Sequence, residues 1–190
     1  MIRKGGGSLA LKNKWKKTKW LLSDRTLRRF VPETKLFNSS SLADMTKRYK
    51  MVYFKPTRGT GGNGIARITR IRGKAFRFKI NERTAEASSV QSLFGKLKKI
   101  ARGRSYMLQR GIHLQTARGR PFDFRAMVQK SRRGKWVSTA VFVKLGKRNK
   151  VVTNYHQGGK LALAEPTLRS AGYNEAQIRR YLRELKTLSL

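Results

Sequence analysis

A lysine followed by a glycine-rich loop is the stretch of this chain whose residue types most clearly suggest chemistry. Lys55 ends a short run of Val, Tyr and Phe that is typical of a β-strand, and the loop of residues 57–64 contains four glycines. Glycines at this density let backbone N–H groups approach a ligand closely, and a lysine amine beside them adds a positive point charge. The combination suits a polyphosphate; the alternative is a flexible hairpin loop without a ligand.

The loop differs from two familiar nucleotide-binding motifs. It lacks the Gly-Lys-Ser/Thr that ends a Walker loop. Residues 65–72 after it have the pattern of a second strand, whereas a dinucleotide-binding loop opens a helix. The sequence therefore predicts a strand, a phosphate-binding loop and a returning strand.

Several further elements are needed to position this loop. Residues 75–80 alternate between basic and apolar side chains, which predicts a third strand. Short helices are expected at residues 25–29 and after Ser40 or Ser41, and Ser88 or Ser89 begins the clearest helix. The apolar residues of that helix form one stripe at helical spacing: Val90, Leu93, Phe94, Leu97 and Ile100.

The C-terminal half has the pattern of a second antiparallel sheet. Strands are predicted at residues 105–109, 121–130, 136–145 and 151–154, and a final helix follows Asn174. This order predicts an α+β fold with two lobes and a nucleotide cleft between them. We expect a basic N-terminal arm at 1–19, a first lobe with the phosphate loop at 20–104, and a second lobe at 105–190.

The charge of the chain is extreme. Its 190 residues include 46 Lys and Arg against 9 Asp and Glu, for a formal net charge of +37 and a pI near 11.7. Such a protein attracts polyanions, so nucleic acid, an anionic wall polymer or a membrane surface are candidate partners, and a solvated cationic surface is the alternative. Most aromatic residues occupy core-like positions, so we expect contacts with phosphates and little stacking on bases.

Composition also excludes some classes of protein. The chain has no Cys, which excludes disulfides and cysteine-ligated metals. No apolar run approaches the ~20 residues of a membrane-spanning helix, and the basic N-terminus is not followed by the apolar stretch of a secretory signal. We therefore expect a cytoplasmic protein.

Seven short motifs resemble, in the expected order, those of the YheC/YheD-type, endospore-coat-associated ATP-grasp proteins. The resemblance covers nearly the whole chain, from about Asn13 to Leu188. The motifs are Asn13-Lys14-Trp15, Val31-Pro32-Glu33-Thr34, Val52-Tyr53-Phe54-Lys55-Pro56, Gly59-Thr60-Gly61-Gly62-Asn63-Gly64-Ile65, Gln109-Arg110-Gly111-Ile112, Arg120-Pro121-Phe122-Asp123-Phe124-Arg125 and Val152-Thr153-Asn154-Tyr155-His156-Gln157-Gly158-Gly159.

The resemblance implies an ATP-grasp fold, which holds ATP between two α+β lobes, and it suggests roles for individual residues. Lys55 would contact the phosphates, as would Lys14, although Lys16 and Lys19 compete for that second role. The loop formed by Thr60, Gly61, Gly62, Asn63 and Gly64 would close over the phosphates. The segment of Gln109, Arg110, Gly111 and Ile112 would read adenine through its backbone edge, and Arg125 and Asn154 would face the phosphates or the acceptor substrate.

The resemblance also implies a reaction, and the sequence departs from the family in one respect. ATP-grasp enzymes typically activate a carboxylate as an acyl phosphate and join it to an amine or thiol, with Mg²⁺ held by carboxylates and an Asn. In this family those ligands lie in a segment downstream of the present chain end at Leu190, so no metal ligand is identified and spore association rests on the family alone.

Three interpretations follow from the sequence. The chain is an ATP-binding, ligase-like protein with weak or absent activity, a cationic scaffold for polyanions or nucleic acid, or a truncated product. An Asp123–Arg125 surface pair is the alternative to a catalytic role for Arg125.

Overall fold

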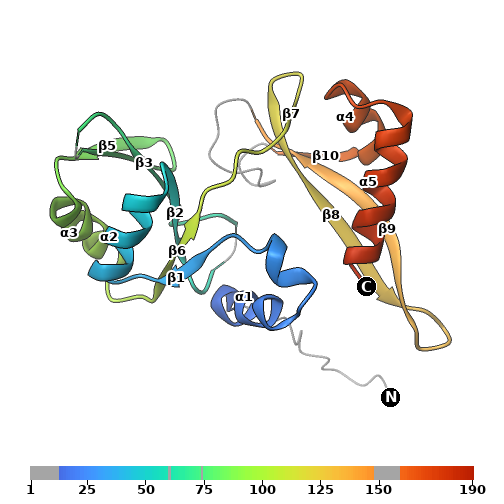
Figure 1. Ribbon diagram of the computed structural model, residues 1–190, viewed down its shortest axis with the longest axis horizontal. Helices are drawn as coiled ribbons and strands as arrows, with labels where there is room; N and C mark the ends of the chain where they lie inside the picture. The colour runs from blue at the N-terminus through green and yellow to red at the C-terminus, as the bar shows by residue number, and fades with distance from the viewer. Residues whose placement is uncertain (1–12, 60, 74, 148–158) are drawn as a thin grey trace, which may run out of the picture. The chain divides into compact units, whose positions relative to one another are not determined.

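The computed structural model describes residues 13–59, 61–73, 75–147 and 159–190. The chain divides into two compact units, Met1–Gly111 and Ile112–Leu190 (Figure 1). The boundary therefore lies after Gly111, not between residues 104 and 105 as the sequence suggested. The reason is the strand at 106–110, which pairs with strands of the first unit.

The first unit is built on a six-stranded antiparallel sheet with the order β1-β6-β2-β3-β4-β5. Its strands are β1 (Thr34–Leu36), β2 (Met51–Pro56), β3 (Ala66–Arg70), β4 (Phe76–Ile80), β5 (Arg83–Ala87) and β6 (Tyr106–Arg110). The strand–loop–strand prediction is confirmed, because β2 pairs with β3 directly across the glycine loop. β6 fills the position between β1 and β2, although it begins some fifty residues after the end of β2.

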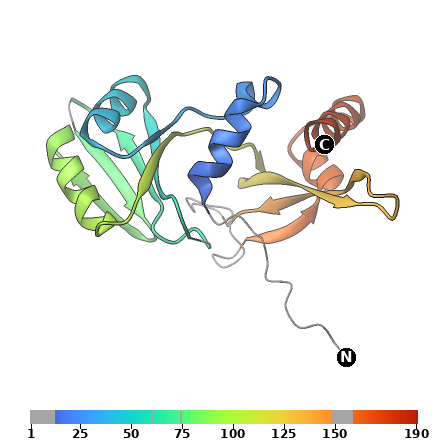
Figure 2. The same ribbon diagram turned by 90° about the horizontal axis from the view of Figure 1, so that it is seen from below.

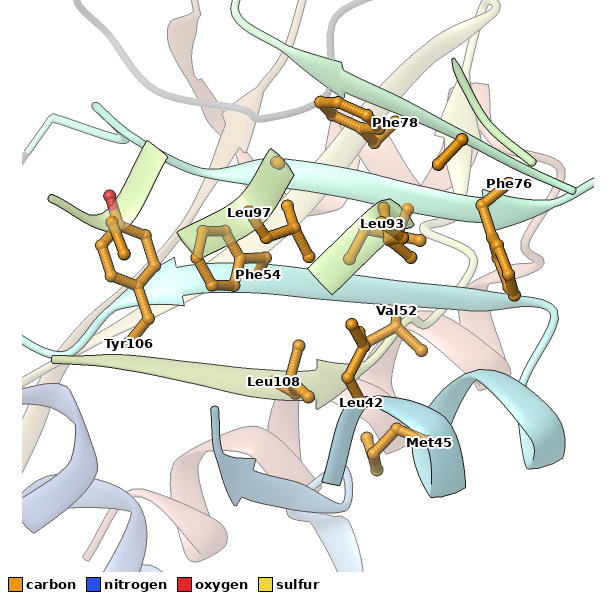
Figure 3. Packing of buried hydrophobic residues seen from close by; sticks show 14 residues of the cluster. Leu42, Met45, Val52, Phe54, Phe76, Phe78, Leu93, Leu97, Tyr106 and Leu108 are labelled. Carbon is orange, nitrogen blue, oxygen red and sulfur yellow. The ribbon is translucent and has the colours of Figure 1, made fainter. Parts of the chain in front are cut away.

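Two amphipathic helices bury one face of this sheet. α2 (Ser39–Arg48) is capped by Asn38 and α3 (Val90–Ala101) by Ser89, whose side chains accept hydrogen bonds from backbone N–H groups of the first turn. Figure 3 shows their apolar residues packed against β2 and its neighbours. The fully buried members include Leu42, Met45, Phe54, Leu93 and Leu97.

The N-terminal segment differs from the predicted arm. Residues 14–19, expected to belong to the arm, lie in helix α1 (Lys14–Ser23), which is followed by a 3₁₀ helix, η1 (Leu27–Phe30). α1 has no apolar stripe that could reveal it in the sequence, because lysines dominate its first two turns. Its start is fixed by Asn13, whose side chain accepts from the Lys16 N–H at 3.1 Å.

The second unit is a four-stranded antiparallel sheet with two helices. Its strands, in the order β10-β9-β8-β7, are β7 (Thr116–Ala117), β8 (Arg120–Lys130), β9 (Trp136–Leu145) and β10 (Lys160–Leu163). The helices are α4 (Ala164–Ser170) and α5 (Glu175–Leu188), and the cap predicted at Asn174 is confirmed as a capping box with Gln177. Phe122, Val143, Leu168 and Ile178 form the buried centre.

Two remaining expectations concern a predicted strand and membrane-spanning helices. The strand predicted at residues 151–154 lies outside the described residues. In the described ranges, no helix is both long and apolar enough to cross a membrane.

Candidate phosphate-binding site

Lys55 lies on the face of β2 opposite the core. Val52, Phe54 and Pro56 point inward, so alternation places Lys55 with Tyr53 on the other face. The Lys55 Nζ donates to Gln109 Oε1 at 2.7 Å and lies 5.0 Å from the centre of the Tyr53 ring. Tyr53 pairs with Gln109 across β2 and β6, so Lys55 meets Gln109 as a diagonal neighbour on the same face.

Gln109 is oriented by a chain of hydrogen bonds. Its Nε2 donates to Thr34 Oγ1 at 3.0 Å, and Thr34 Oγ1 donates to the Pro32 carbonyl at 2.8 Å. The amide oxygen of Gln109 is therefore the atom that faces Lys55. Thr34 belongs to a motif noted in the sequence, but its role as the support of Gln109 depends on the β1–β6 pairing and was not predicted.

The backbone donors next to Gln109 are already engaged. The Arg110 N–H donates to the Glu33 carbonyl at 2.8 Å, and the Gly111 N–H donates to the Met51 carbonyl at 2.9 Å. These two N–H groups are therefore hydrogen-bonded within the first unit, and the reading of adenine by the backbone edge of this segment stays a prediction. Ile112 begins the second unit and its side chain is exposed.

Lys14 reaches the glycine loop from the first turn of α1. Its Nζ donates to the Gly59 carbonyl at 2.6 Å, and its backbone N–H donates to the Thr57 carbonyl at 2.7 Å. Lys14 is half-buried, whereas Lys16 and Lys19 are exposed. Of the three lysines considered from the sequence, Lys14 is the one that the structure places against the loop.

Burial and a neighbouring lysine lower the pKa of both amines. Burial, and then the charge of Lys14, lowers the pKa of Lys55 to about 8 from 10.5. Burial, and then the charge of Lys17, lowers the pKa of Lys14. No ion pair joins either amine to a carboxylate within the part of the chain that the structure describes. A bound anion would supply the missing negative charge.

The loop has the backbone conformation that its glycines permit. Gly59, Gly61, Gly62 and Gly64 all have positive φ, from 70° to 128°. Its entry is held by Thr57, whose N–H and Oγ1 contact the Ser105 carbonyl at 3.0 and 3.1 Å.

The rest of the loop contains Thr60, Asn63 and Gly64. Asn63 is exposed, and Thr60 lies outside the described residues. A Cβ atom added to Gly64 would lie 2.8 Å from Tyr106 Oη, so the loop passes close to β6. The proximity of Tyr106 to the loop was not predicted, because it depends on a strand distant in sequence.

Arg125 has a different environment in the second unit. Its Nε donates to Asp123 Oδ1 at 2.8 Å and its Nη2 to Oδ2 at 3.1 Å. The two side chains share a face of β8, as predicted, and the surface-pair interpretation describes the observed contact. A catalytic role for Arg125 stays a prediction, and Asn154 lies outside the described residues.

Two comparisons place the chain among known proteins. A family model described as YheC/D like ATP-grasp matches residues 8–190. The chain is also 33% identical over 159 residues to the endospore coat-associated protein YheD of Bacillus subtilis (strain 168). That alignment covers 80% of this chain and 35% of the relative, so the chain spans about a third of the relative's length.

Proposed function

Because this chain belongs to the YheC/D-like ATP-grasp family, we propose that its first unit binds ATP through the phosphates, with Lys14, Lys55 and the loop of residues 57–64. The observation that carries the proposal is the pair of lysine amines beside the loop. Both have a lowered pKa, and neither has a carboxylate partner among the described residues.

The triphosphate fits the chemistry of these groups. Lysine suits phosphate as a compact charge, and successive N–H groups in a loop with positive φ can form an anion-binding concavity. The Gln109 amide oxygen is a neutral acceptor that orients the Lys55 amine without cancelling its charge. A phosphate oxygen near Lys55 would replace a neutral partner by a charged one, which strengthens the hydrogen bond.

Other residues are proposed to contact the adenine ring and the acceptor substrate. The segment of Gln109 to Ile112 is proposed to lie beside adenine, with carbonyl groups and the Ile112 side chain in place of the occupied N–H groups. Arg125 and Asn154 are proposed to act on the phosphates or the acceptor substrate, as the family resemblance implies.

Ligase chemistry by this chain is proposed to be weak. The described residues contain no group of three or more His, Cys, Asp or Glu side chains suited to a metal, so these residues do not fit Mg²⁺. Asp123 is engaged with Arg125, and Glu33 and Asp44 with Arg48. Release of ADP at about 1 s⁻¹ or faster with amines or thiols, within the range of ordinary turnover, would contradict this part of the proposal. Spore association, which the name of the relative states for that protein, is likewise a proposal for this chain.

A calorimetric titration with ATP tests the phosphate site. Lys55→Ala is expected to weaken ATP binding by about 1.5–3 kcal/mol, the usual contribution of a hydrogen bond to a charged group. Lys55→Arg should rescue only part of this loss, because a planar fork replaces a compact charge. Lys14→Ala should weaken binding in the same direction.

The control is Lys79→Ala, which removes the same charge from another strand of the same sheet. It should leave ATP affinity nearly unchanged. Equal titrations for the wild type and Lys55→Ala, or equal losses for Lys55→Ala and Lys79→Ala, would reject the assignment of the site.

A further inference from the structure

The outer half of the β8–β9 hairpin extends beyond the core of its unit. Phe122 and Val143, in its inner half, are buried. Residues 125–127, 129, 130 and 132–137 are all exposed. Figures 1 and 2 both show the turn of the hairpin lying clear of α4 and α5. We call residues 128–138 the hairpin arm; a two-stranded ribbon of this kind has little core of its own.

A β-bulge determines which face of the arm carries its tryptophan. Met127 pairs with Ala140 but Val128 pairs with Ser138, so Thr139 is an extra residue in β9. The Thr139 Oγ1 fixes the bulge through contacts with Gln129 Oε1 at 2.7 Å and the Met127 carbonyl at 3.3 Å.

The bulge shifts the alternation of β9 by one residue and brings Trp136 opposite Lys130. The Lys130 Nζ lies 5.4 Å from the centre of the Trp136 ring. Trp136 is nevertheless 60% exposed. An indole and an amine are therefore presented together on one face of the arm.

The turn adds positive charge in an ordered conformation. Lys130, Arg132, Arg133 and Lys135 are all exposed, and no Asp or Glu occurs between Asp123 and Glu165. Two hydrogen bonds close the turn. The Ser131 N–H donates to the Lys135 carbonyl at 2.8 Å, and the Gly134 N–H donates to the Ser131 carbonyl at 2.9 Å. The charges are thus held beside the indole by a hydrogen-bonded turn.

We propose that the hairpin arm binds single-stranded nucleic acid, with a base stacked on Trp136 and phosphates on the surrounding Lys and Arg side chains. Stacking on an exposed aromatic ring together with a basic track is the general mode of single-strand recognition. A duplex offers phosphates but keeps its base faces stacked inside. An anionic bilayer fits less well, because the charged residues Arg132 and Arg133 occupy the tip, where an inserting hairpin needs apolar side chains.

Two tryptophans are exceptions to the expectation that most aromatic residues occupy core-like positions. Phe54 and Phe122 are buried as expected, whereas Trp136 is exposed and Trp20 is 62% exposed on α1. The bulge places Trp136 on the same face of the hairpin as Phe122 and Val143, and Trp136 is exposed because the ribbon extends beyond the core.

The test compares a labelled oligothymidylate of about 15 nucleotides, within the usual span of single-strand sites, with a duplex of equal length. Fluorescence anisotropy at fixed salt is the measurement. Trp136→Ala is expected to weaken single-strand binding roughly 5- to 100-fold and duplex binding less than about 2-fold. Trp136→Phe should retain most of the single-strand affinity, because it keeps an aromatic face.

Two further variants complete the design. Trp20→Ala removes an equally exposed indole outside the arm and should have little effect on either ligand. Replacing Arg132, Arg133 and Lys135 by Ser should make the negative slope of log K against log salt less steep by about 2 for the single strand, because each phosphate contact contributes roughly 0.7. Lys55→Ala should not alter these results, which separates them from the ATP site.

Three outcomes would overturn the proposal. One is equal loss of single-strand and duplex binding in Trp136→Ala, and another is an equal effect of Trp20→Ala. The third is loss of binding to phosphatidylglycerol vesicles in Trp136→Ala without loss of oligothymidylate binding, which would assign the arm to a membrane surface.

Discussion

At the scale of single residues, Lys55 combines burial with an incomplete set of partners. Its amine has a neutral acceptor in Gln109 and a like charge in Lys14. A folded-state pKa of about 8, below the ordinary 10.5, means that the fold favours the neutral amine. The charged form therefore reduces stability below pH 8, and this effect fades as the pH rises from about 8 toward 10.5.

The same shift predicts how ATP binding depends on pH. Phosphate favours the charged amine, so affinity should be highest near pH 7 and fall as the pH rises through 8, where free Lys55 loses its proton. The γ-phosphate is already ionised in this range, since phosphate monoesters have a second pKa near 6. Calorimetry in buffers of different ionisation enthalpy should detect proton uptake on binding at pH 8–9, the region of the lowered pKa of Lys55.

Lys55→Arg is the control for this pH dependence. The guanidinium stays charged over the whole range. The ATP affinity of this variant should therefore vary much less than that of the wild type between about pH 7 and 9.5, the range around the lowered pKa of Lys55. An identical fall in affinity for both proteins would assign the titration to another group.

The parts of this site that are adjacent in the sequence could be predicted, whereas the parts that the fold brings together from distant segments could not. Lys55 and the glycine loop are adjacent in the chain, and Gln109 was singled out within its motif. Lys14 could not be separated from Lys16 and Lys19, because only the docking of α1 at Thr57 distinguishes them. Thr34 and Tyr106 support the site through strand pairing, which the sequence does not display.

At the scale of elements, substitution of Gly64 tests whether the loop requires glycine, and substitution of Gly95 in α3 is the control. Gly64 has a φ of +73°, and a Cβ there would lie 2.8 Å from Tyr106 Oη. Gly64→Ala should therefore destabilise the protein by about 1–3 kcal/mol, the usual cost of strained backbone, and weaken ATP binding. Gly95 lies within α3 with nothing within 4 Å of an added Cβ.

The matched change Gly95→Ala should stabilise the protein by roughly 0.5–1 kcal/mol, because alanine has the higher helix propensity. Urea unfolding of both variants provides the comparison. Stabilisation by Gly64→Ala would show that the loop does not require this backbone conformation.

The elements that the sequence revealed are those with a regular apolar pattern. α3, β2 and the capped α5 follow their predicted ranges closely. β5 was missed because four of its five residues are exposed and only pairing with β4 defines it. α4 was missed because it contains Pro166, which a helix tolerates in its first turn.

At the scale of the whole molecule, the charge of +37 is not explained by one nucleotide site. The cations extend over both units, from α1 to α5. Most of the acids are paired with them, as in the contacts of Glu33 and Asp44 with Arg48, where hydrogen bonds from Arg48 hold the pKa of both carboxyls at about 2. We expect the surplus charge to attract polyanions without defining a site.

Duplex DNA measures this diffuse attraction separately from the hairpin arm. Binding should be independent of sequence, and if six or more phosphates are neutralised it should weaken by roughly 10³-fold or more between about 50 and 200 mM salt. Lys55→Ala should leave it almost unchanged, because one charge of 46 is lost. Removal of residues 1–12 together with Arg70→Glu, Arg72→Glu and Lys74→Glu should weaken it more, since many charges then change at once. Anisotropy titrations over a salt series provide the slope. Duplex binding that persists at high salt, or that strongly prefers one sequence, would contradict a diffuse origin, because counterion release carries no sequence information.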